Sequence, residues 1–364
     1  TAESTATSTE ATSEAAASGS KTDVAFVTDV GNIDDQSFNQ YTWQGVQDFC
    51  SANSLNANYY RPTEDSDAAR LEQMDNAVND GAKAVVVAGY LFGSSIAEAQ
   101  AKYPDVEFLA LDVSTVDLGD TAPAENTALI TYKEEQAGYL AGYAAVYDGY
   151  KELGFLGGMA VPAVIRYGYG FVQGVDAAAA AKGVEGVEVN YIYGGQFNGD
   201  GDITAVMDTW YSNGTQLVFA CGGGIFTSAA EAAQKVNGKV IGVDTDQSAV
   251  IDGGYGEGMT VTSAMKGLAP TTIDTLTDVI VNGNWANYAG KIETLGLVSA
   301  DDPSANYVQL PLETTQWADG KFTVEDYTAL VADMFNGKVK VSNDTTVEPT
   351  VSNIAVNYLG NIKG

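Results

Sequence analysis

The sequence has no histidine, only two cysteines and few basic residues, and each shortage excludes a class of function. Without histidine the chain cannot form a Ser-His-Asp triad, a Cys-His pair or a His-ligated zinc site. Two cysteines cannot build a disulfide scaffold or a four-thiolate metal site. The 17 Lys and Arg against 48 Asp and Glu give a formal net charge of −31. That charge argues against non-specific binding to nucleic acid and to anionic lipid.

Long apolar runs are lacking as well. No stretch approaches the roughly 18 apolar residues of a membrane span, so we expect none. Apolar residues make up 45% of the chain and charged residues 18%, which suffices for a packed core. The 364 residues exceed the length of roughly 250–300 at which single cores stop growing, so two lobes are predicted.

The N-terminal segment is polar and of low complexity. Residues 1–20 contain only Thr, Ser, Ala, Glu and Gly, and the chain begins at Thr1 rather than Met. We therefore predict a processed or truncated chain with a disordered polar tether over residues 1–21; the alternative is a leftover of recombinant expression. An exported lipoprotein would carry its lipid on a cysteine upstream of such a tether, and that cysteine is not in this sequence.

From Lys21 onward, short apolar runs alternate with amphipathic stretches. The predicted strands span residues 23–28, 57–61, 84–88, 107–111, 127–131, 153–156, 188–193, 216–219, 239–243 and 259–262. The predicted helices between them span residues 37–50, 68–79, 96–102, 134–147, 164–182, 204–212 and 227–236. This alternation indicates βαβ units, parallel sheets and the α/β class.

The chain divides into two α/β halves, followed by a tail that could re-enter both of them through a hinge of several crossing segments. The tail has predicted helices at 271–281 and 324–335 and a strand at 307–310. Cys50 and Cys221 fall in different halves, so we expect both to be free. The predicted boundaries are 22–130 plus about 266–310 for lobe 1, 131–265 plus about 311–345 for lobe 2, and 346–364 for a C-terminal segment.

The first motif that can carry chemistry is the loop DVGNIDDQSFNQ, residues 29–40, between the first strand and the first helix. Asp34 or Asp35 can cap that helix, which would then present free N–H groups to the cleft. Phe38 and Asn39 fall in the first turn. An aromatic ring beside an amide suits a flat polar heterocycle, which stacks and accepts or donates hydrogen bonds. The alternative is a capped helix with Phe38 in the core.

Several motifs together resemble one family. The opening loop, with its Asp-Val-Gly and Ser-Phe-Asn elements, is similar to that of the basic membrane protein family, the nucleoside-binding lipoproteins similar to PnrA. The resemblance covers residues from about 22 to 340. The other matching segments are Tyr103-Pro104-Asp105 with Phe108 and Asp112, Gly157-Gly158-Met159 with Pro162, Arg166-Tyr167, Gly170-Phe171 and Gly174-Val175, Ile241–Gln247, and Thr262–Lys266.

This resemblance implies the type I periplasmic-binding-protein fold, in which two Rossmann-like lobes joined by a multi-segment hinge close on a ligand. It implies an extracytoplasmic receptor of an ABC importer, lipid-anchored to the outer face of the cell membrane, with a permease and an ATPase as partners. The implied ligands are nucleosides, purine nucleosides foremost. No enzymatic activity, cofactor, metal or nucleic-acid partner is expected, and we expect a monomer.

The resemblance also implies the ligand-binding residues. Phe38 would stack on the base, and carboxylates together with Asn39 would read its edge. Asp244 and Lys266 would hold the ribose hydroxyls and neutralise one another; the alternative is a purely structural ion pair. The matching positions are Asp29, Phe38, Asn39, Asp112, Asp244 and Lys266.

In the second half, two further residues complete the predicted site. Phe197 is the expected second aromatic, with Tyr193 behind it, and Tyr167 is either a ligand contact or core packing. Gly223 lies in the run Cys221–Gly224, where glycine lets a ligand approach backbone N–H groups. No Lys-Ser/Thr follows this run, so it is not a phosphate loop.

Other functions remain open at this point. One is a binding protein for a sugar or an autoinducer-like furanose on the same fold, and another is a sensor subunit that signals to a membrane receptor. The third is a calcium-dependent nucleoside hydrolase, suggested by the aspartates of residues 29–35, although such enzymes commonly use a histidine that this chain lacks.

Overall fold

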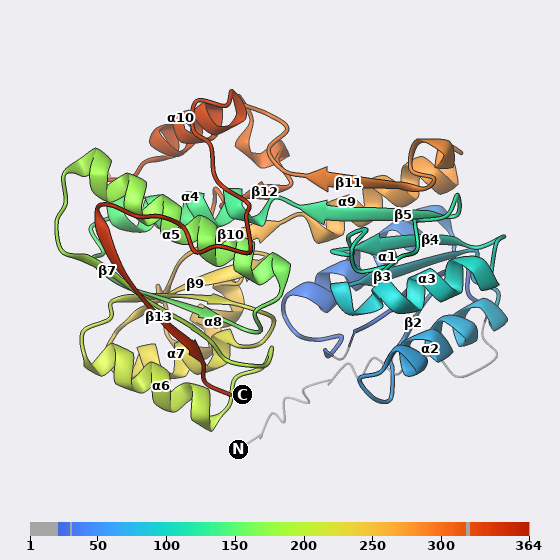
Figure 1. Cartoon of the computed structure of the whole chain (residues 1–364), viewed down its shortest axis with the longest axis horizontal. Coiled ribbons are helices and arrows are strands. Elements are labelled where there is room, and N and C mark those ends of the chain that lie inside the picture. Colours follow the sequence, from blue (N-terminus) through green and yellow to red (C-terminus); the bar gives the residue numbers. More distant parts are fainter. Residues whose placement is uncertain (1–20, 30, 318–320, 364) are drawn as a thin grey trace, which may run out of the picture.

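The computed structural model describes residues 21–29, 31–317 and 321–363. It forms two α/β lobes, each built on one sheet (Figure 1). The tether predicted for residues 1–21 lies outside the described residues apart from Lys21. Among the described residues, none of the helices has both the length and the apolar composition that a membrane span requires.

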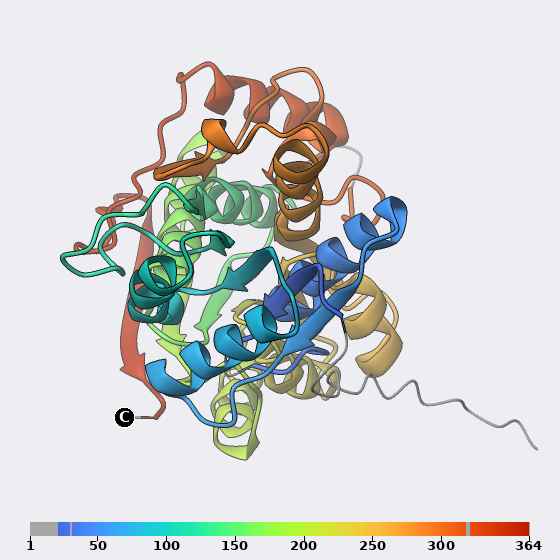
Figure 2. The same ribbon diagram turned by 90° about the vertical axis from the view of Figure 1, so that its right-hand side faces the viewer.

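The first lobe contains a six-stranded sheet in which all neighbouring strands are parallel. In spatial order these are β11 (Lys291–Leu295), β5 (Thr127–Tyr132), β4 (Glu107–Leu111), β3 (Ala84–Ala88), β1 (Val24–Val27) and β2 (Ala57–Tyr60). Side chains alternate between the faces of β1, so Phe26 packs in one core and Val27 in another. The helices are α1 (Phe38–Asn53) and α9 (Leu268–Leu276) on one face, and α2 (Asp67–Asn79) and α3 (Gly93–Lys102) on the other (Figure 2).

The second lobe contains a seven-stranded sheet, parallel except for the pairing of its first two strands. In spatial order these are β12 (Val308–Gln309), β10 (Thr260–Lys266), β9 (Lys239–Asp244), β8 (Leu217–Cys221), β6 (Glu152–Gly157), β7 (Val187–Tyr193) and β13 (Ile354–Asn361). One face packs on α4 (Glu134–Tyr147) and α5 (Pro162–Lys182), and the other on α6 (Gly201–Ser212), α7 (Phe226–Gln234) and α8 (Ser248–Tyr255).

Helices α4 and α5 lie unusually close because glycines meet the opposing backbone. A Cβ atom added at Gly138 would lie 2.1 Å from the carbonyl oxygen of Tyr167, and one at Gly170 would lie 2.1 Å from that of Glu135. Real Cβ atoms do not approach so closely, so only glycine fits at these positions. This pair of helices therefore packs with its backbones in close contact.

Three chain segments connect the lobes. They run from β5 to α4, from β10 to α9, and from β11 to β12. The exact residue boundaries of the lobes stay a prediction; β12, which we placed near the end of lobe 1, pairs with β10 in the second sheet.

The eleven predicted strands correspond to β1–β10 and β12, and the predicted helices correspond to α1–α7, α9 and α10 (Val324–Phe335), with shifted ends. Residues 277–281 of the predicted tail helix form a π-helical turn. Elements not predicted are α8, β11 and β13. Short helices η1 (Tyr90–Phe92), η2 (Thr277–Val281), η3 (Trp285–Asn287) and η4 (Pro303–Ala305) complete the described elements.

Candidate functional site

A cavity of about 410 Å³ lies between the two sheets, at the carboxyl ends of their parallel strands. This is where open α/β sheets bind ligands, and the volume falls within the range of small-molecule sites. All eight predicted site residues line it, although their role in binding stays a prediction. They are Asp29, Phe38, Asn39, Asp112, Phe197, Gly223, Asp244 and Lys266.

The loop before α1 is organised by Asp35. Its Oδ1 accepts hydrogen bonds from the backbone N–H groups of Ser37 and Gln40 at 2.9 and 3.1 Å, and its Oδ2 accepts that of Asn39 at 2.9 Å. Burial raises the pKa of Asp35 to about 6, although these hydrogen bonds oppose the shift. Asp35 therefore caps the helix as expected, but it takes up N–H groups that we had expected to face the cleft.

The side chain of Asn39 is held by two carboxylates. Its Nδ2 donates to Asp29 Oδ1 at 2.9 Å and to Asp35 Oδ2 at 3.1 Å, and Asp29 Oδ1 also accepts the N–H of Gly31 at 2.6 Å. Asn39 Oδ1 is buried and has no hydrogen-bond partner among the described residues. The amide nitrogen is thus engaged by two carboxylates, whereas the amide oxygen has no partner in the described part of the chain.

Lys266 stands at the centre of a buried charge cluster. Its Nζ donates to Asp112 Oδ2 in a short contact, lies 3.3 Å from Glu134 Oε1 and lies 3.9 Å from Asp244 Oδ1. Its side chain is 3% exposed. The partner that we predicted, Asp244, is therefore the most distant of the three carboxylates, because Asp112 reaches Lys266 across the interlobe boundary.

Opposing effects set the charge states of this cluster. Burial acts to lower the pKa of Lys266, but Asp112, Glu134 and Asp244 outweigh it and hold the pKa above its ordinary value. Burial acts to raise the pKa of Glu134, but Arg166 and Lys266 hold it below its ordinary value. For Asp112 burial prevails and raises the pKa to about 6, even beside Lys266.

Aromatic rings surround the ammonium group of Lys266. Its Nζ lies 4.9 Å from the centroid of Phe38, 5.5 Å from that of Tyr132 and 5.7 Å from that of Tyr167. These distances fall in the range of cation–π attraction. Phe38 is half-buried and lines the cavity, so part of its surface remains available to a flat ligand.

Asp112 and Asp244 occupy related positions, one after β4 and the other at the end of β9. Both have left-handed backbone conformations, with φ of 54° and 65°, which aspartate tolerates better than most residues. Asp112 Oδ1 is buried without a hydrogen-bond partner among the described residues. Asp244 accepts from the Ser37 hydroxyl at 2.7 Å and from the Tyr167 hydroxyl at 3.4 Å.

The lobes contact one another directly beside the cavity. Besides the Lys266–Asp112 pair, Ser37 bonds to Asp244, and the Gln247 amide donates to the carbonyl oxygen of Gln36 at 3.1 Å. Each contact joins the loop of one lobe to a strand end or loop of the other. The conformation described is therefore one in which the two lobes are closed on each other.

Phe197 forms part of the wall contributed by the second lobe. Its ring packs against glycines: a Cβ atom at Gly158 would lie 2.4 Å from Phe197 Cδ1, and one at Gly222 would lie 3.0 Å from it. Gly223, with φ of 51°, sits behind the Phe197 backbone. Tyr193 is not among the described residues that line the cavity; its hydroxyl bonds to that of Tyr191 at 2.9 Å.

Sequence reasoning missed three members of the central cluster. Glu134 and Tyr132 were not singled out, and Arg166 entered only as part of a matching segment. Arg166 Nε donates to Glu134 Oε2 at 2.6 Å, and the Glu134 side chain is fully buried. The available signal was the pair Glu134-Glu135 directly after a strand, a pattern that also suits an ordinary helix start.

Both cysteines are free, as predicted, and both are buried. Cys221 lines the cavity, and burial raises the pKa of its thiol well above the ordinary value. Burial raises the pKa of Cys50 to about 11, so neither thiol is activated as a nucleophile. In the part of the chain that the structure describes, no group of three or more acidic or cysteine side chains could hold a metal ion.

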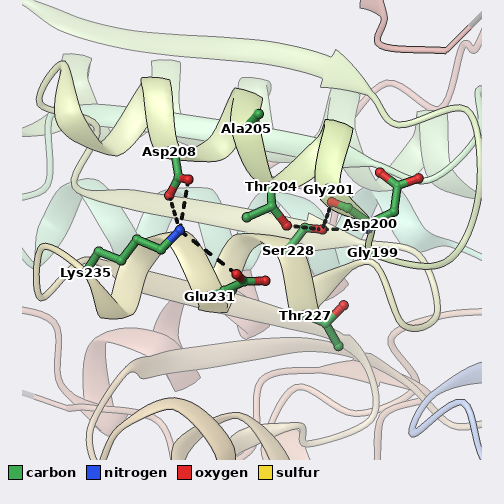
Figure 3. Close-up of a pocket in the computed structure, with 10 residues that line it drawn as sticks. All are labelled: Gly199, Asp200, Gly201, Thr204, Ala205, Asp208, Thr227, Ser228, Glu231 and Lys235. Carbon is green, nitrogen blue, oxygen red and sulfur yellow. Dashed lines mark hydrogen bonds and ion pairs between the residues drawn. The ribbon is translucent and has the colours of Figure 1, made fainter.

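A second hollow, of about 400 Å³, lies on the surface between α6 and α7 (Figure 3). Its polar side chains satisfy one another. Lys235 pairs with Asp208 at 2.8 Å, and the Ser228 hydroxyl bonds to Thr204 at 2.9 Å and to the backbone of Asp200. It contains no aromatic residue, so we place the candidate site in the interlobe cavity.

Comparison with known proteins supplies independent findings. The sequence model of the family described as "ABC transporter substrate-binding protein PnrA-like" matches residues 22–300. The ABC transporter nucleoside-binding protein BmpA of Lactococcus lactis subsp. cremoris is 28% identical over 243 residues, covering 62% of this chain and 65% of that protein. An uncharacterized lipoprotein of Pyrococcus abyssi is 26% identical over 289 residues, covering 76% of this chain and 67% of the other. This chain thus spans about two thirds of the length of these curated relatives.

Among solved structures, an ABC transporter solute-binding protein from Conexibacter woesei has a TM-score of 0.67 at 21% identity. The alignment covers 88% of this chain and 99% of that one. At this identity the likeness bears on the fold alone, which is that of the two-lobed solute-binding proteins, as predicted.

Proposed function

The chain belongs to the PnrA-like family of ABC transporter substrate-binding proteins, as its motifs indicated, and we propose that it captures nucleosides in its interlobe cavity. Purine nucleosides are the ligands that we favour. The observation that carries the proposal is that one cavity is lined by an available aromatic ring and by Asn39 and Asp112, each of which has a buried oxygen without a partner among the described residues. The name of the Lactococcus relative, a nucleoside-binding protein, points to the same ligand class.

The base would lie against Phe38. Stacking on an aromatic ring contributes roughly 1–3 kcal/mol per base. Near Phe38, Asn39 Oδ1 and Asp112 Oδ1 are buried acceptors without partners among the described residues. Because such atoms are costly to leave unpaired, we expect the ligand to present N–H or O–H donors to them. The edge of a nucleobase with amino or imino groups meets this requirement.

The ribose would lie beside Lys266 and Asp244. The ammonium can donate to a hydroxyl, and the carboxylate can accept from vicinal hydroxyls; bonds to charged groups contribute about 1.5–3 kcal/mol each. Lys266 already contacts Asp112 and Glu134, so it has limited freedom to move. The sugar would therefore meet a pre-positioned donor, which reduces the entropic cost of binding.

The charge of the cavity favours nucleosides over their phosphates. Six aspartates line it against the two cations Arg166 and Lys266. The excess of negative charge would repel a phosphate group, whereas a neutral nucleoside meets no such barrier.

In this proposal the protein is the receptor of an importer. The lobes would hinge about the three connecting segments, close on the nucleoside and dock as a closed form on an ABC permease that works with an ATPase. We propose an extracytoplasmic monomer that is attached to the membrane by lipid on a residue outside this sequence. The contacts of Ser37 with Asp244 and of Gln36 with Gln247 would hold the closed form.

The proposal is tested by isothermal titration of the purified protein with adenosine, guanosine, inosine, cytidine and ribose. We expect the purine nucleosides to bind most tightly. Binding of ribose without any nucleoside would instead support the sugar-receptor alternative. Release of ribose from inosine in the presence of calcium would support the hydrolase, and mass spectrometry of co-purified ligand gives an independent identification.

A further inference from the structure

The C-terminal strand β13 completes the second sheet along the free edge of β7 (Figure 1). Before the strand, the backbone N–H groups of Ser352 and Asn353 donate to Asp176 on α5 at 3.0 and 2.7 Å. Within the strand, the ring of Tyr358 lies 5.1 Å from that of Tyr191. Strand β13 is therefore fixed to the lobe at its beginning and along its length.

The end of this strand contacts a loop of the candidate site. We call residues 194–200, which carry Phe197, the aromatic loop. Ile362 N–H donates to the carbonyl oxygen of Tyr193 at 2.8 Å, immediately before the loop. Gly195 has φ of 85°, and a Cβ atom there would lie 2.9 Å from both the Cβ and the carbonyl oxygen of Lys363. The strand end thus supports one side of the loop, while the other side lines the cavity.

Lys363 is linked to the loop through Asp200. Its Nζ makes a short contact with Asp200 Oδ2, and the same oxygen accepts the amide of Gln196 at 3.0 Å. Gln196 directly precedes Phe197. On its other oxygen, Asp200 accepts the N–H groups of residues 202 and 203 and so caps α6. Asp200 therefore joins the strand end, the aromatic loop and a helix.

The opposite side of the loop leaves little room for Phe197 to shift. Gly194 and Gly195 donate to the carbonyl oxygens of Gly157 and Gly158 at 2.7 and 2.8 Å. The Phe197 ring packs closely on Gly158 and Gly222. Loss of support on the Lys363 side would let the loop relax away from the cavity.

We propose that Lys363, two residues after the end of β13, is a positioning residue that holds the aromatic loop so that Phe197 meets the bound ligand. This inference rests on the proposed function only in taking the ligand to be a nucleoside. It concerns a part of the chain beyond the family match, which ends at residue 300, so family membership does not supply it. The surface pairing of Lys363 with Asp200 thereby acts on a binding site that neither side chain lines.

The experiment compares Lys363→Met with wild type by titration with guanosine and by amide hydrogen exchange of the aromatic loop. We expect guanosine affinity to fall by about three- to tenfold, since part of the stacking is lost. The exchange of loop amides should become faster, and the midpoint of thermal unfolding should stay close to that of wild type. The matched control is Lys235→Met, which breaks the Lys235–Asp208 pair in the same lobe and should change neither affinity nor loop exchange.

Three further variants separate positioning from a general structural effect. Asp200→Asn keeps a cap for α6 but removes the charge opposite Lys363, and it should reproduce the loss. In a Phe197→Ala background, Lys363→Met should have no further effect on affinity. Lys363→Arg should restore most of the wild-type affinity.

The outcomes are distinct. Wild-type affinity and unchanged loop exchange in Lys363→Met would overturn the positioning role and leave the proposed function intact. An equal loss of affinity with and without Phe197 would overturn it as well. If wild type bound no nucleoside, the proposed function would fail, and the loop exchange would still decide whether Lys363 holds the loop.

Discussion

Replacement of Lys266 by methionine tests the central cluster most directly. The change keeps the apolar stem and removes the charge. The Lys266 side chain is 3% exposed, and its contact partner Asp112 is 7% exposed. Loss of one member of a buried pair leaves an uncompensated charge and typically costs about 3–5 kcal/mol. Glu134 still has Arg166 as a partner at 2.6 Å, so the uncompensated charge in the variant is mainly that of Asp112. We therefore expect the free energy of unfolding to fall by about 3 kcal/mol at pH 8.

The loss of unfolding free energy in Lys266→Met should depend on pH. Burial already raises the pKa of Asp112 to about 6 in the presence of Lys266, and removal of the ammonium would raise it further. A carboxyl group whose pKa is higher in the folded than in the unfolded state stabilises the folded protein at low pH. That contribution to the free energy of unfolding is lost as the pH rises through the folded-state pKa. The free energy of unfolding of the variant should therefore fall further below that of wild type between pH 6 and 8. The difference between the two free energies should narrow when the pH is lowered to 5.5.

The assay is urea unfolding of both proteins, without ligand, at pH 5.5 and pH 8. The control is Lys102→Met, which breaks an exposed pair with Asp75 and should leave the urea midpoint close to that of wild type, because exposed ion pairs contribute little to stability. The double variant Lys266→Met/Asp112→Asn should recover part of the loss, because no unpaired charge remains. The reasoning is refuted if Lys266→Met unfolds at the same urea concentration as wild type at pH 8. It is also refuted if the double variant loses as much free energy of unfolding as the two single variants lose in sum.

Three other changes give sharp expectations. Phe38→Ala should weaken nucleoside binding by about 1–3 kcal/mol in calorimetry, whereas Phe335→Ala, on the exposed end of α10, should not; equal affinities would contradict the stacking role. Burial raises the pKa of Glu135 to about 7, so the free energy of unfolding should fall between pH 5 and 8. Glu135→Gln should make that fall shallower by about 2 kcal/mol, and an unchanged slope would exclude this group as its source. Gly170→Ala should lower the free energy of unfolding by about 1–3 kcal/mol, because its Cβ would meet the Glu135 backbone. Gly253→Ala, in a helix with open space around it, should be neutral or slightly stabilising, and similar values for both glycines would count against the close packing of α4 on α5.

Much of the architecture was predictable because its signals are local. The apolar run of residues 84–88 between helical stretches identifies a buried strand, and the same holds for the other members of β1–β10. Strand β11 was missed because all but one of its residues are exposed, so it has no buried apolar pattern. Strand β13 was missed for a similar reason, since its partly buried residues alternate with exposed ones.

Eight residues of the site were predictable, but the roles of Glu134, Tyr132 and Arg166 and the pairings within the site were not. The eight residues came from the motifs and from strand ends, and all of them line one cavity. The sequence paired Lys266 with Asp244, whereas Asp112, 154 residues away in the chain, makes the direct contact. Such pairings depend on how two lobes meet, which local patterns do not encode.

The placement of β11 and β13 constrains the order in which the chain can fold during synthesis. Strand β11 pairs with β5 across more than 160 positions, and β13 pairs with β7 across 167. On the ribosome, the edges of β5 and β7 must therefore wait, unpaired, for strands that are translated much later. Neither lobe can therefore reach its final form as an autonomous N-terminal unit before these late strands have been synthesised.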